Sequence, residues 1–130
     1  CLGMQLLFNY SDEFGLSEGL RVFDGHVKKF NLKDVSIVPH VGWNKISMNN
    51  KDDFFDKKVF DNQFMYFVHS FYVEPKDPNN IFLTSNYENK FFCSGVKKKN
   101  IYGFQFHPEK SGPTGLNFYN EIKKFFENKK

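Results

Sequence analysis

Residues 64–73 read FMYFVHSFYV, an apolar run interrupted only by His69 and Ser70. A continuous apolar run of this length, rich in aromatic residues, is typical of a strand that is buried on both faces. Three further strand-like segments follow at residues 81–87, 91–96 and 101–106, and tight connections join them. The second half of the sequence therefore predicts a sheet of several strands.

Helical patterns lie at both ends of the sequence. Directly after Cys1, the apolar residues that recur at helical spacing are Leu2, Met4, Leu6, Leu7 and Tyr10. In the last segment, the apolar residues that share one helical face are Leu116, Tyr119, Ile122, Phe125 and Phe126. A helix, several strands and a final helix predict an α/β fold in which helices flank a mixed sheet.

Less regular segments separate these elements. Residues 11–19 and 75–80 read as loops, and residues 20–30 read as strand pieces interrupted by an Asp24-Gly25 turn. Residues 35–38 form a short β-branched run that Pro39 stops, and Asp52 or Asp53 is placed to cap a helical turn. No internal linker or repeat is visible, so we expect one domain over residues 1–130.

The composition is that of an ordinary folded domain. The 130 residues carry 18 basic and 15 acidic side chains, mixed along the chain, for a net charge of +3. This balance argues against nucleic acid as a partner, and the basic run Lys97-Lys98-Lys99 reads as a solvated turn. No apolar stretch reaches the length of a membrane span, and no signal peptide is visible. Cysteines at positions 1 and 93 make no disulfide framework, so we expect a reducing, cytosolic setting.

The His107-Pro108-Glu109 segment brings an imidazole and a carboxylate close together in the sequence. Pro108 favours an extended conformation at His107, and in an extended segment residues two positions apart share a face. A carboxylate beside an imidazole holds its tautomer and stabilises the imidazolium, as in the triads of nucleophilic hydrolases. Alone, this motif is not specific, because most short His–Glu pairs lie on protein surfaces.

Cys1 is placed to act as a nucleophile. A thiol directly before a helix lies at the positive end of the helix dipole, which favours the thiolate. An unperturbed thiol titrates at about 8.5, so a neighbouring imidazole is a second means of activating it at neutral pH. Gly3 allows the sharp turn of a nucleophile elbow. Cys93, in the strand-like FFCSG, reads instead as a buried, inert thiol.

Four segments, in this order, resemble the class I (triad) glutamine amidotransferases. They are CLGMQLLF at residues 1–8, PHVGWN at 39–44, YFVHSFY at 66–72 and GFQFHPEKSGPTGL at 103–116. The last three are similar in particular to the glutaminase subunits of imidazole glycerol phosphate synthases. The resemblance covers essentially the whole chain. It implies the C-terminal two-thirds of such a subunit, with a flavodoxin-like fold that lacks its N-terminal strands.

The resemblance also implies roles in glutamine hydrolysis. Cys1 attacks the side-chain carboxamide of glutamine, His107 serves as base and then as acid, and Glu109 orients His107. The residues that would hold glutamine are Leu2, Gln5, Glu13, His69, Ser70 and Phe71. From the residues alone, Gln5 also fits an exposed helix position and Ser70 a satisfied strand hydroxyl, so these readings stay open.

A partner is implied as well. It is a (β/α)₈-barrel cyclase subunit that receives the ammonia and makes imidazole glycerol phosphate and AICAR in histidine biosynthesis. The residues that match the partner-facing segment are Pro39, His40, Gly42, Trp43 and Asn44. Trp43 also fits a core position. No metal or organic cofactor is implied, since the triad and backbone donors can handle all charge changes. His40 is not expected to bind a metal, because no Cys/His/Asp spacing nearby completes a site.

The family's first strands and glycine-rich oxyanion loop have no counterpart in this sequence. The Leu2 backbone N–H remains, but losing one donor from such a site costs about a hundred- to thousandfold in turnover. We therefore expect a fragment that is inactive or unfolded alone, and an active intact protein.

Three other readings stay open. Cys1 fits an N-terminal nucleophile whose α-amine is the base, which needs neither His107 nor Glu109. A non-catalytic scaffold is disfavoured because all three of these residues are present. A glutaminase that serves a sugar-modifying amidotransferase of surface polysaccharide synthesis keeps the chemistry and changes the acceptor, and the richness of residues 14–58 in Phe, Lys and Asn is compatible with it.

Overall fold

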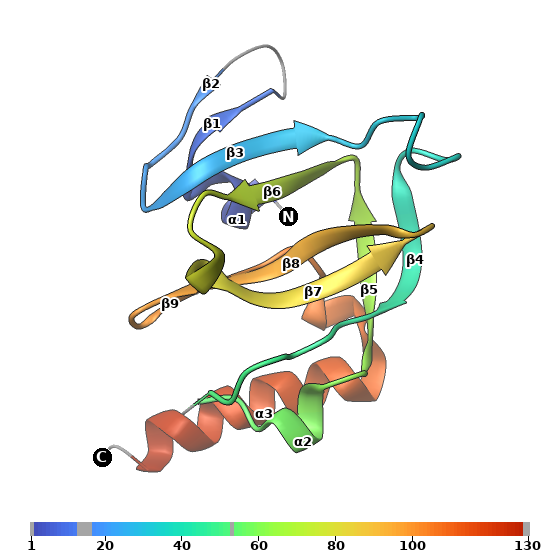
Figure 1. The fold of residues 1–130 in the computed structure, drawn as a ribbon. Helices are drawn as coiled ribbons and strands as arrows, with labels where there is room; N and C mark the ends of the chain where they lie inside the picture. The colour runs from blue at the N-terminus through green and yellow to red at the C-terminus, as the bar shows by residue number, and fades with distance from the viewer. Residues whose placement is uncertain (1, 13–16, 53, 129–130) are drawn as a thin grey trace.

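Within residues 2–12, 17–52 and 54–128, which the computed structural model describes, seven strands form one mixed sheet (Figure 1). Their bounds are β1 Phe8–Ser11, β2 Ser17–Glu18, β3 Phe23–Lys29, β6 Phe71–Pro75, β7 Ile81–Tyr87, β8 Lys90–Lys98 and β9 Ile101–Phe104. The order is β2–β1–β3–β6–β8–β7, and β9 also pairs with β8. The β1–β3 pair is parallel and the other pairs are antiparallel.

A two-stranded ribbon accompanies this sheet. Strands β4 (His40–Lys45) and β5 (Phe64–His69) pair antiparallel, in a register that runs from His40 opposite His69 to Lys45 opposite Phe64. After β4, the chain forms a single bridge to β7 between Ser47 and Thr84. Strand β5 passes directly through Ser70 into β6, so the ribbon and the main sheet meet at that residue.

Helices flank the sheet, which confirms the predicted α/β class. In Figure 1, α2 (Lys57–Phe60) and α3 (Gly112–Asn128) lie together below β7 and β8, whereas α1 (Leu2–Leu6) lies near β1, β3 and β6. Two short 3-10 turns, η1 (Pro78–Asn80) and η2 (Pro108–Lys110), precede β7 and α3. In the part of the chain that the structure describes, no helix combines the length and the apolar character needed to cross a membrane.

Two apolar clusters hold these layers together. The larger, aromatic cluster joins the strands to α3 and includes Phe55, Phe67, Phe92, Phe106 and Phe118. The smaller cluster lies between α1 and the sheet and includes Met4, Phe8, Phe23, Val27 and Val96. An added Cβ at Gly103 would lie 3.0 Å from Met4 Cγ, so α1 approaches β9 as closely as a glycine allows.

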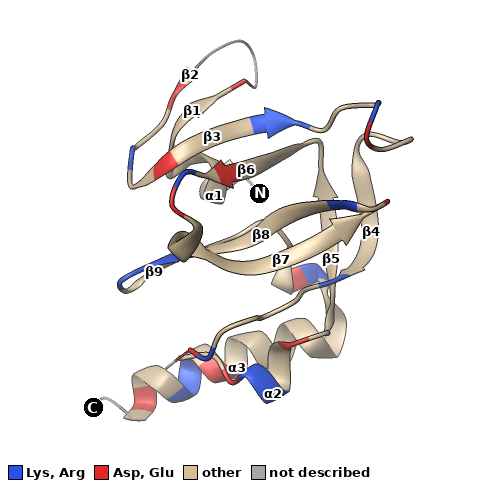
Figure 2. Cartoon of the chain, in the orientation of Figure 1, with Lys and Arg blue, Asp and Glu red and all other residues tan. Residues whose placement is uncertain are grey.

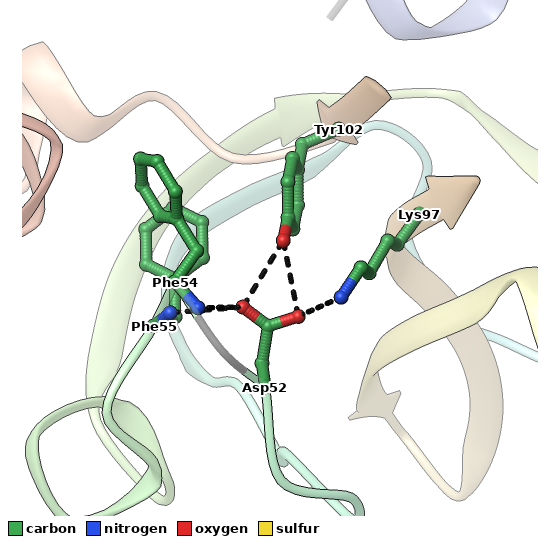
Figure 3. Close-up of polar contacts among 5 residues, drawn as sticks. All are labelled: Asp52, Phe54, Phe55, Lys97 and Tyr102. Atoms are coloured by element: carbon green, nitrogen blue, oxygen red, sulfur yellow. Dashed lines mark hydrogen bonds and ion pairs between the residues drawn. The ribbon is translucent and has the colours of Figure 1, made fainter. Parts of the chain in front are cut away.

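Asp52 fastens the loop between β4 and α2 onto the main sheet (Figure 3). Its carboxylate, 1% exposed, accepts hydrogen bonds from the backbone N–H groups of Phe54 and Phe55 at 2.8 and 2.9 Å. The Tyr102 hydroxyl on β9 contacts both carboxylate oxygens at 3.1 and 3.0 Å, and Lys97 on β8 pairs with Oδ2. Burial acts to raise the pKa of Asp52, but these donors, above all Lys97, hold it below its usual value. The carboxylate therefore stays charged and fixes the loop.

Basic and acidic residues are interspersed along α3, and lysines gather at the β8–β9 turn (Figure 2). Lys98 and Lys99 are exposed there, as predicted for a solvated turn. Lys97 departs from that prediction, because its side chain is bound to the buried Asp52 rather than to solvent alone.

The prediction of one strand over residues 64–73, buried on both faces, was wrong. The chain bends at Ser70, so the run is divided between β5 in the ribbon and β6 in the main sheet. On β5, Phe64 and Val68 are 50% and 39% exposed, while the alternate residues Met65 and Phe67 are buried. One face of β5 covers the core and the other faces solvent, which an apolar run alone does not distinguish.

Three local predictions were also wrong. The first helix ends at Leu6, and Phe8 instead begins a strand because its ring stacks on Phe23 in the core. Asp24-Gly25 is no turn: β3 continues through Gly25, where an added Cβ would lie 2.5 Å from Glu74 O on β6. Asp52 does make cap-like bonds to the N–H groups of Phe54 and Phe55, but no helix starts there. The cap of α2 is Asp56, which accepts from Lys58 N, and Asp53 lies outside the described residues.

Other predictions hold. The three strand segments after residue 80 appear as β7, β8 and β9, and the final segment forms helix α3. The predicted apolar face is only partly right, because Leu116, Tyr119 and Phe126 are 62%, 45% and 62% exposed. Residues 35–38, by contrast, form no strand: Val35 is irregular and residues 36–38 are bends.

Candidate active site

The predicted site residues fall on α1, the β5–β6 junction and η2. The described ones are Leu2, Gln5, His69, Ser70, Phe71, His107 and Glu109. Cys1 and Glu13 lie outside the described residues. The described residues therefore show how the predicted base and the predicted substrate-binding groups are held.

His107 is fixed to β5 by a closed set of hydrogen bonds. Its backbone N–H donates to Tyr66 O at 2.9 Å. Ser111 Oγ donates to His107 O at 2.6 Å and accepts the N–H of Tyr66 at 3.0 Å. We call these three residues the Tyr66 clamp. Because Ser111 is 1% exposed, solvent does not compete with its bonds, and the clamp sets the backbone position of the imidazole.

Glu109 contacts the imidazole of His107, with 2.7 Å between His107 Nδ1 and Glu109 Oε1. His107 is extended, with φ −108° and ψ 96°, as Pro108 favours. Glu109 lies in the η2 turn, so the expectation of a fully extended segment was wrong, and the contact is made across a turn. A hydrogen bond from its own backbone N–H, and then the bond to His107, lower the pKa of Glu109. Glu109 is thus an anion that accepts from Nδ1, while the ring of His107, whose side chain is 25% exposed, remains accessible.

Gln5 and His69 converge on one carbonyl oxygen. Gln5 Nε2 lies 3.5 Å from Phe71 O, and His69 Nδ1 lies 2.7 Å from the same atom. Gln5 is 8% exposed, so its alternative reading as an exposed helix residue is wrong. Ser70, which lies between His69 and Phe71 in the chain, accepts the N–H of Phe30 at 3.0 Å through its carbonyl. The β5–β6 junction is therefore tied both to α1 and to the segment after β3.

His69 also belongs to a buried pair of histidines. His40 Nδ1 lies 2.9 Å from His69 Nε2, and the two residues are 4% and 6% exposed. Burial lowers the pKa of His40 to about 4. Burial likewise lowers the pKa of His69 to about 3 and outweighs the hydrogen bond to the Phe71 carbonyl, which acts to raise it; His40 and His107 lower it further by smaller amounts. Both rings are therefore neutral at neutral pH.

Strand β4 exposes alternate side chains. Val41 and Trp43 are 54% and 55% exposed, so the reading of Trp43 as a core residue is wrong. Pro39 is exposed as well, Gly42 and Asn44 are partly buried, and His40 points inward. Contact of this segment with a partner stays a prediction. Its exposed surface is formed mainly by Val41 and Trp43.

Cys93 is the buried thiol that its sequence context predicts. Its Sγ donates to Gly95 O at 3.1 Å, and burial raises the pKa of Cys93 to about 12. This thiol does not form a thiolate at neutral pH. Among the residues that the structure describes, no three His, Cys, Asp or Glu side chains gather as a metal site would require.

Sequence reasoning missed the roles of Tyr66 and Ser111. Both lie inside the segments YFVHSFY and HPEKSG, so their closeness to the predicted residues was the available signal. It also gave His40 and His69 unrelated roles, because nothing in the sequence indicates that their rings meet.

The chain is similar to known proteins along most of its length. The profile of the family described as Glutamine amidotransferase class-I matches residues 1–125. The chain is 47% identical to the imidazole glycerol phosphate synthase subunit HisH of Pyrococcus furiosus, over 89% of this chain and 58% of that protein. It is 46% identical to the imidazole glycerol phosphate synthase subunit HisH 2 of Methanococcus maripaludis, over 89% of this chain and 56% of that protein. With the subunit HisH of Chlorobaculum tepidum the identity is 38%, over 96% and 61%. The chain thus spans less than two thirds of each relative.

The neutral histidine pair predicts a loss of stability in mild acid. An unfolded histidine has a pKa of about 6.5, whereas burial lowers the pKa of His40 to about 4 and that of His69 to about 3. At pH values between the folded and the unfolded pKa, the unfolded state binds more protons than the folded state. The free energy of unfolding of the complete protein should therefore fall below about pH 6.5, by at most about 1.4 kcal/mol per pH unit for each histidine. Urea denaturation at a series of pH values measures this slope.

Two variants separate the sources of this slope. His40→Phe keeps a ring and removes one of the two titrations, so the slope should fall by about half. Asp52→Asn is the control. In the folded state the pKa of Asp52 is lowered. Its contribution to the free energy of unfolding, about 1–3 kcal/mol, is therefore present above the unfolded pKa of about 3.9 and is lost only at lower pH. That variant should be less stable throughout, with the slope unchanged. A wild-type slope no steeper than that of His40→Phe would contradict the neutral pair.

Proposed function

The chain belongs to the class-I glutamine amidotransferase family, and from this membership we propose that its protein hydrolyses glutamine to glutamate and ammonia through a cysteinyl thioester. The observation that carries the proposal is the 2.7 Å contact between His107 Nδ1 and Glu109 Oε1. It fixes the tautomer of an accessible imidazole, leaving Nε2 for proton transfer, as a triad base requires. The reducing cytosol, where a free thiol persists, suits such a nucleophile.

In this mechanism Cys1 gives its thiol proton to His107, and its sulfur attacks the carboxamide carbon of glutamine. The backbone N–H of Leu2 helps to stabilise the oxyanion of the tetrahedral intermediate. The imidazolium, paired with Glu109, then returns the proton to the amide nitrogen, so the C–N bond breaks and ammonia leaves. His107 next takes a proton from water, whose hydroxide attacks the γ-glutamyl thioester. The C–S bond then breaks, His107 returns the proton to the sulfur, and glutamate and the thiol are released.

The same proposal assigns glutamine recognition to two parts of the chain. Gln5 on α1, together with Glu13, holds one end of the substrate. The predicted group of His69, Ser70 and Phe71 holds the other, His69 through its backbone because both of its ring nitrogens are bonded within the protein. The convergence of Gln5 and His69 on Phe71 O supports this grouping, because it joins residues from both parts at one atom.

The ammonia acceptor is a cyclase subunit with a (β/α)₈ barrel, in an imidazole glycerol phosphate synthase of histidine biosynthesis. Support comes from the relatives, which bear the name of that synthase. These names favour this acceptor over a sugar-modifying amidotransferase. The exposed Val41 and Trp43 on β4 suit a surface that a partner covers.

Replacement of Trp43 tests the partner surface. Trp43→Ala in the complete protein should weaken binding of the cyclase subunit by about tenfold or more, since exposed tryptophans at interfaces carry much of the binding energy. Isothermal titration calorimetry measures the affinity. Leu20→Ala is the control, because Leu20 is 70% exposed and lies between β2 and β3, which do not pair with β4. Equal affinities for the wild type and Trp43→Ala would exclude this surface.

Replacement of the base tests the chemistry. His107→Ala in the complete protein should slow alkylation of Cys1 by a glutamine-directed affinity label by about 10²- to 10⁴-fold, because the thiol loses its base. Mass spectrometry of the labelled peptide locates and times the reaction. Cys93→Ala is the control and should leave the label on Cys1 unchanged. Undiminished labelling of His107→Ala would indicate an N-terminal nucleophile instead.

A further inference from the structure

We propose that His40, a residue buried behind the candidate site, is a positioning residue for glutamine binding. It acts through His69 on the peptide of Phe71, where two predicted substrate-binding residues converge. The inference rests on the proposed glutaminase function and adds a residue whose side chain touches no substrate.

A continuous chain of polar contacts leads from β4 to this peptide. His40 and His69 are direct partners in the β4–β5 register, and their rings meet at 2.9 Å between Nδ1 and Nε2. His69 Nδ1 continues the chain to Phe71 O at 2.7 Å. At the other end, Asn44 Nδ2 lies 3.4 Å from His40 Nε2 and donates to Asn86 O at 2.8 Å.

Only one set of tautomers satisfies these contacts when both rings are neutral. The Phe71 carbonyl can only accept, so His69 carries its proton on Nδ1 and presents a lone pair at Nε2. His40 must then donate from Nδ1, which leaves its Nε2 to accept from the Asn44 amide. In each of the three bonds Asn44–His40, His40–His69 and His69–Phe71, the residue nearer Asn44 is therefore the donor.

Aromatic packing holds His40 in this orientation. Its ring stacks on Tyr87, with 4.1 Å between centroids, and on Phe67 at 5.1 Å. His69 is in turn packed edge-on against Phe30 at 5.2 Å. With both histidines buried, no solvent replaces a lost partner, so removing the His40 donor leaves His69 Nε2 unsatisfied.

The loss of that donor would act on the Phe71 peptide. Without the His40 donor nothing fixes the Nε2 side of the ring, so the His69 ring can turn and its Nδ1–H bond to the Phe71 carbonyl loses its alignment. The carbonyl then keeps only the longer contact with Gln5, 3.5 Å. The Ser70–Phe71 backbone, which the proposed function assigns to glutamine, loses its fixed orientation. Substrate affinity should suffer more than the chemical step.

Two variants of the complete protein distinguish the loss of the hydrogen-bond donor at position 40 from the loss of the aromatic ring. His40→Phe keeps the stacked ring and removes the donor, whereas His40→Asn loses the ring but presents an amide N–H at the position of Nδ1. For His40→Phe we expect KM for glutamine to rise about three- to tenfold, with kcat changed less than about twofold. His40→Asn should return KM to within about twofold of the wild type, even if it is less stable.

The ring nitrogens of His69 give a readout that needs no activity. In ¹⁵N NMR spectra at about pH 8, above the usual histidine pKa, His69 should carry its proton on Nδ1 in the wild type and in His40→Asn. In His40→Phe that Nδ1 proton should exchange faster with solvent and lose the downfield shift of a short hydrogen bond, because the ring is no longer held in line with the Phe71 carbonyl. An unchanged Nδ1–H resonance of His69 in His40→Phe, with unchanged solvent exchange, or an unchanged KM in an active enzyme, would overturn the role of His40. A wild-type protein without glutaminase activity would overturn the proposed function instead, whatever the tautomer.

Discussion

The Tyr66 clamp is the contact on which the candidate site depends. Strand β5 uses one edge to pair with β4, and at Tyr66 it also bonds the segment that carries the base. His107 and Ser111 approach Tyr66 from far along the chain, 45 residues away in the case of Ser111. Helix α3 begins at Gly112, whose φ of 59° lets the chain leave the clamp in a direction that other residues rarely allow. The base and the final helix are thus placed together.

Burial gives the titratable groups of this region different chemistry. His40 and His69 are enclosed by aromatic rings and stay neutral, so they serve as directional donors and acceptors. His107 lies nearer the surface beside an anion, which suits a group that gains and loses a proton. Cys93 shows what enclosure does to a thiol, since burial raises its pKa to about 12. A nucleophilic thiol needs the opposite surroundings, at a helix start and beside an imidazole.

Local patterns predicted what local interactions determine. The strands after residue 80 and helix α3 follow from apolar periodicity, and the His107–Glu109 contact follows from their spacing, although its geometry is a turn. The division of residues 64–73 depends on which sheet each half joins, which the run itself does not encode. Gly25 suggested a turn, but a glycine is needed there because Glu74 O on the neighbouring strand β6 leaves no room for a Cβ, and the sequence around Gly25 does not show this. The histidine pair was equally invisible, because its members lie 29 residues apart.

The central claim is that a thiolate at the start of α1 is served by the imidazole that β5 holds. The most direct test is an experimental structure of the complete protein trapped as its γ-glutamyl thioester. The account predicts Cys1 Sγ within about 3–4 Å of His107 Nε2, with the glutamyl group against the Ser70–Phe71 backbone. A sulfur and an imidazole on opposite sides of the sheet, or an acyl group on another residue, would contradict it.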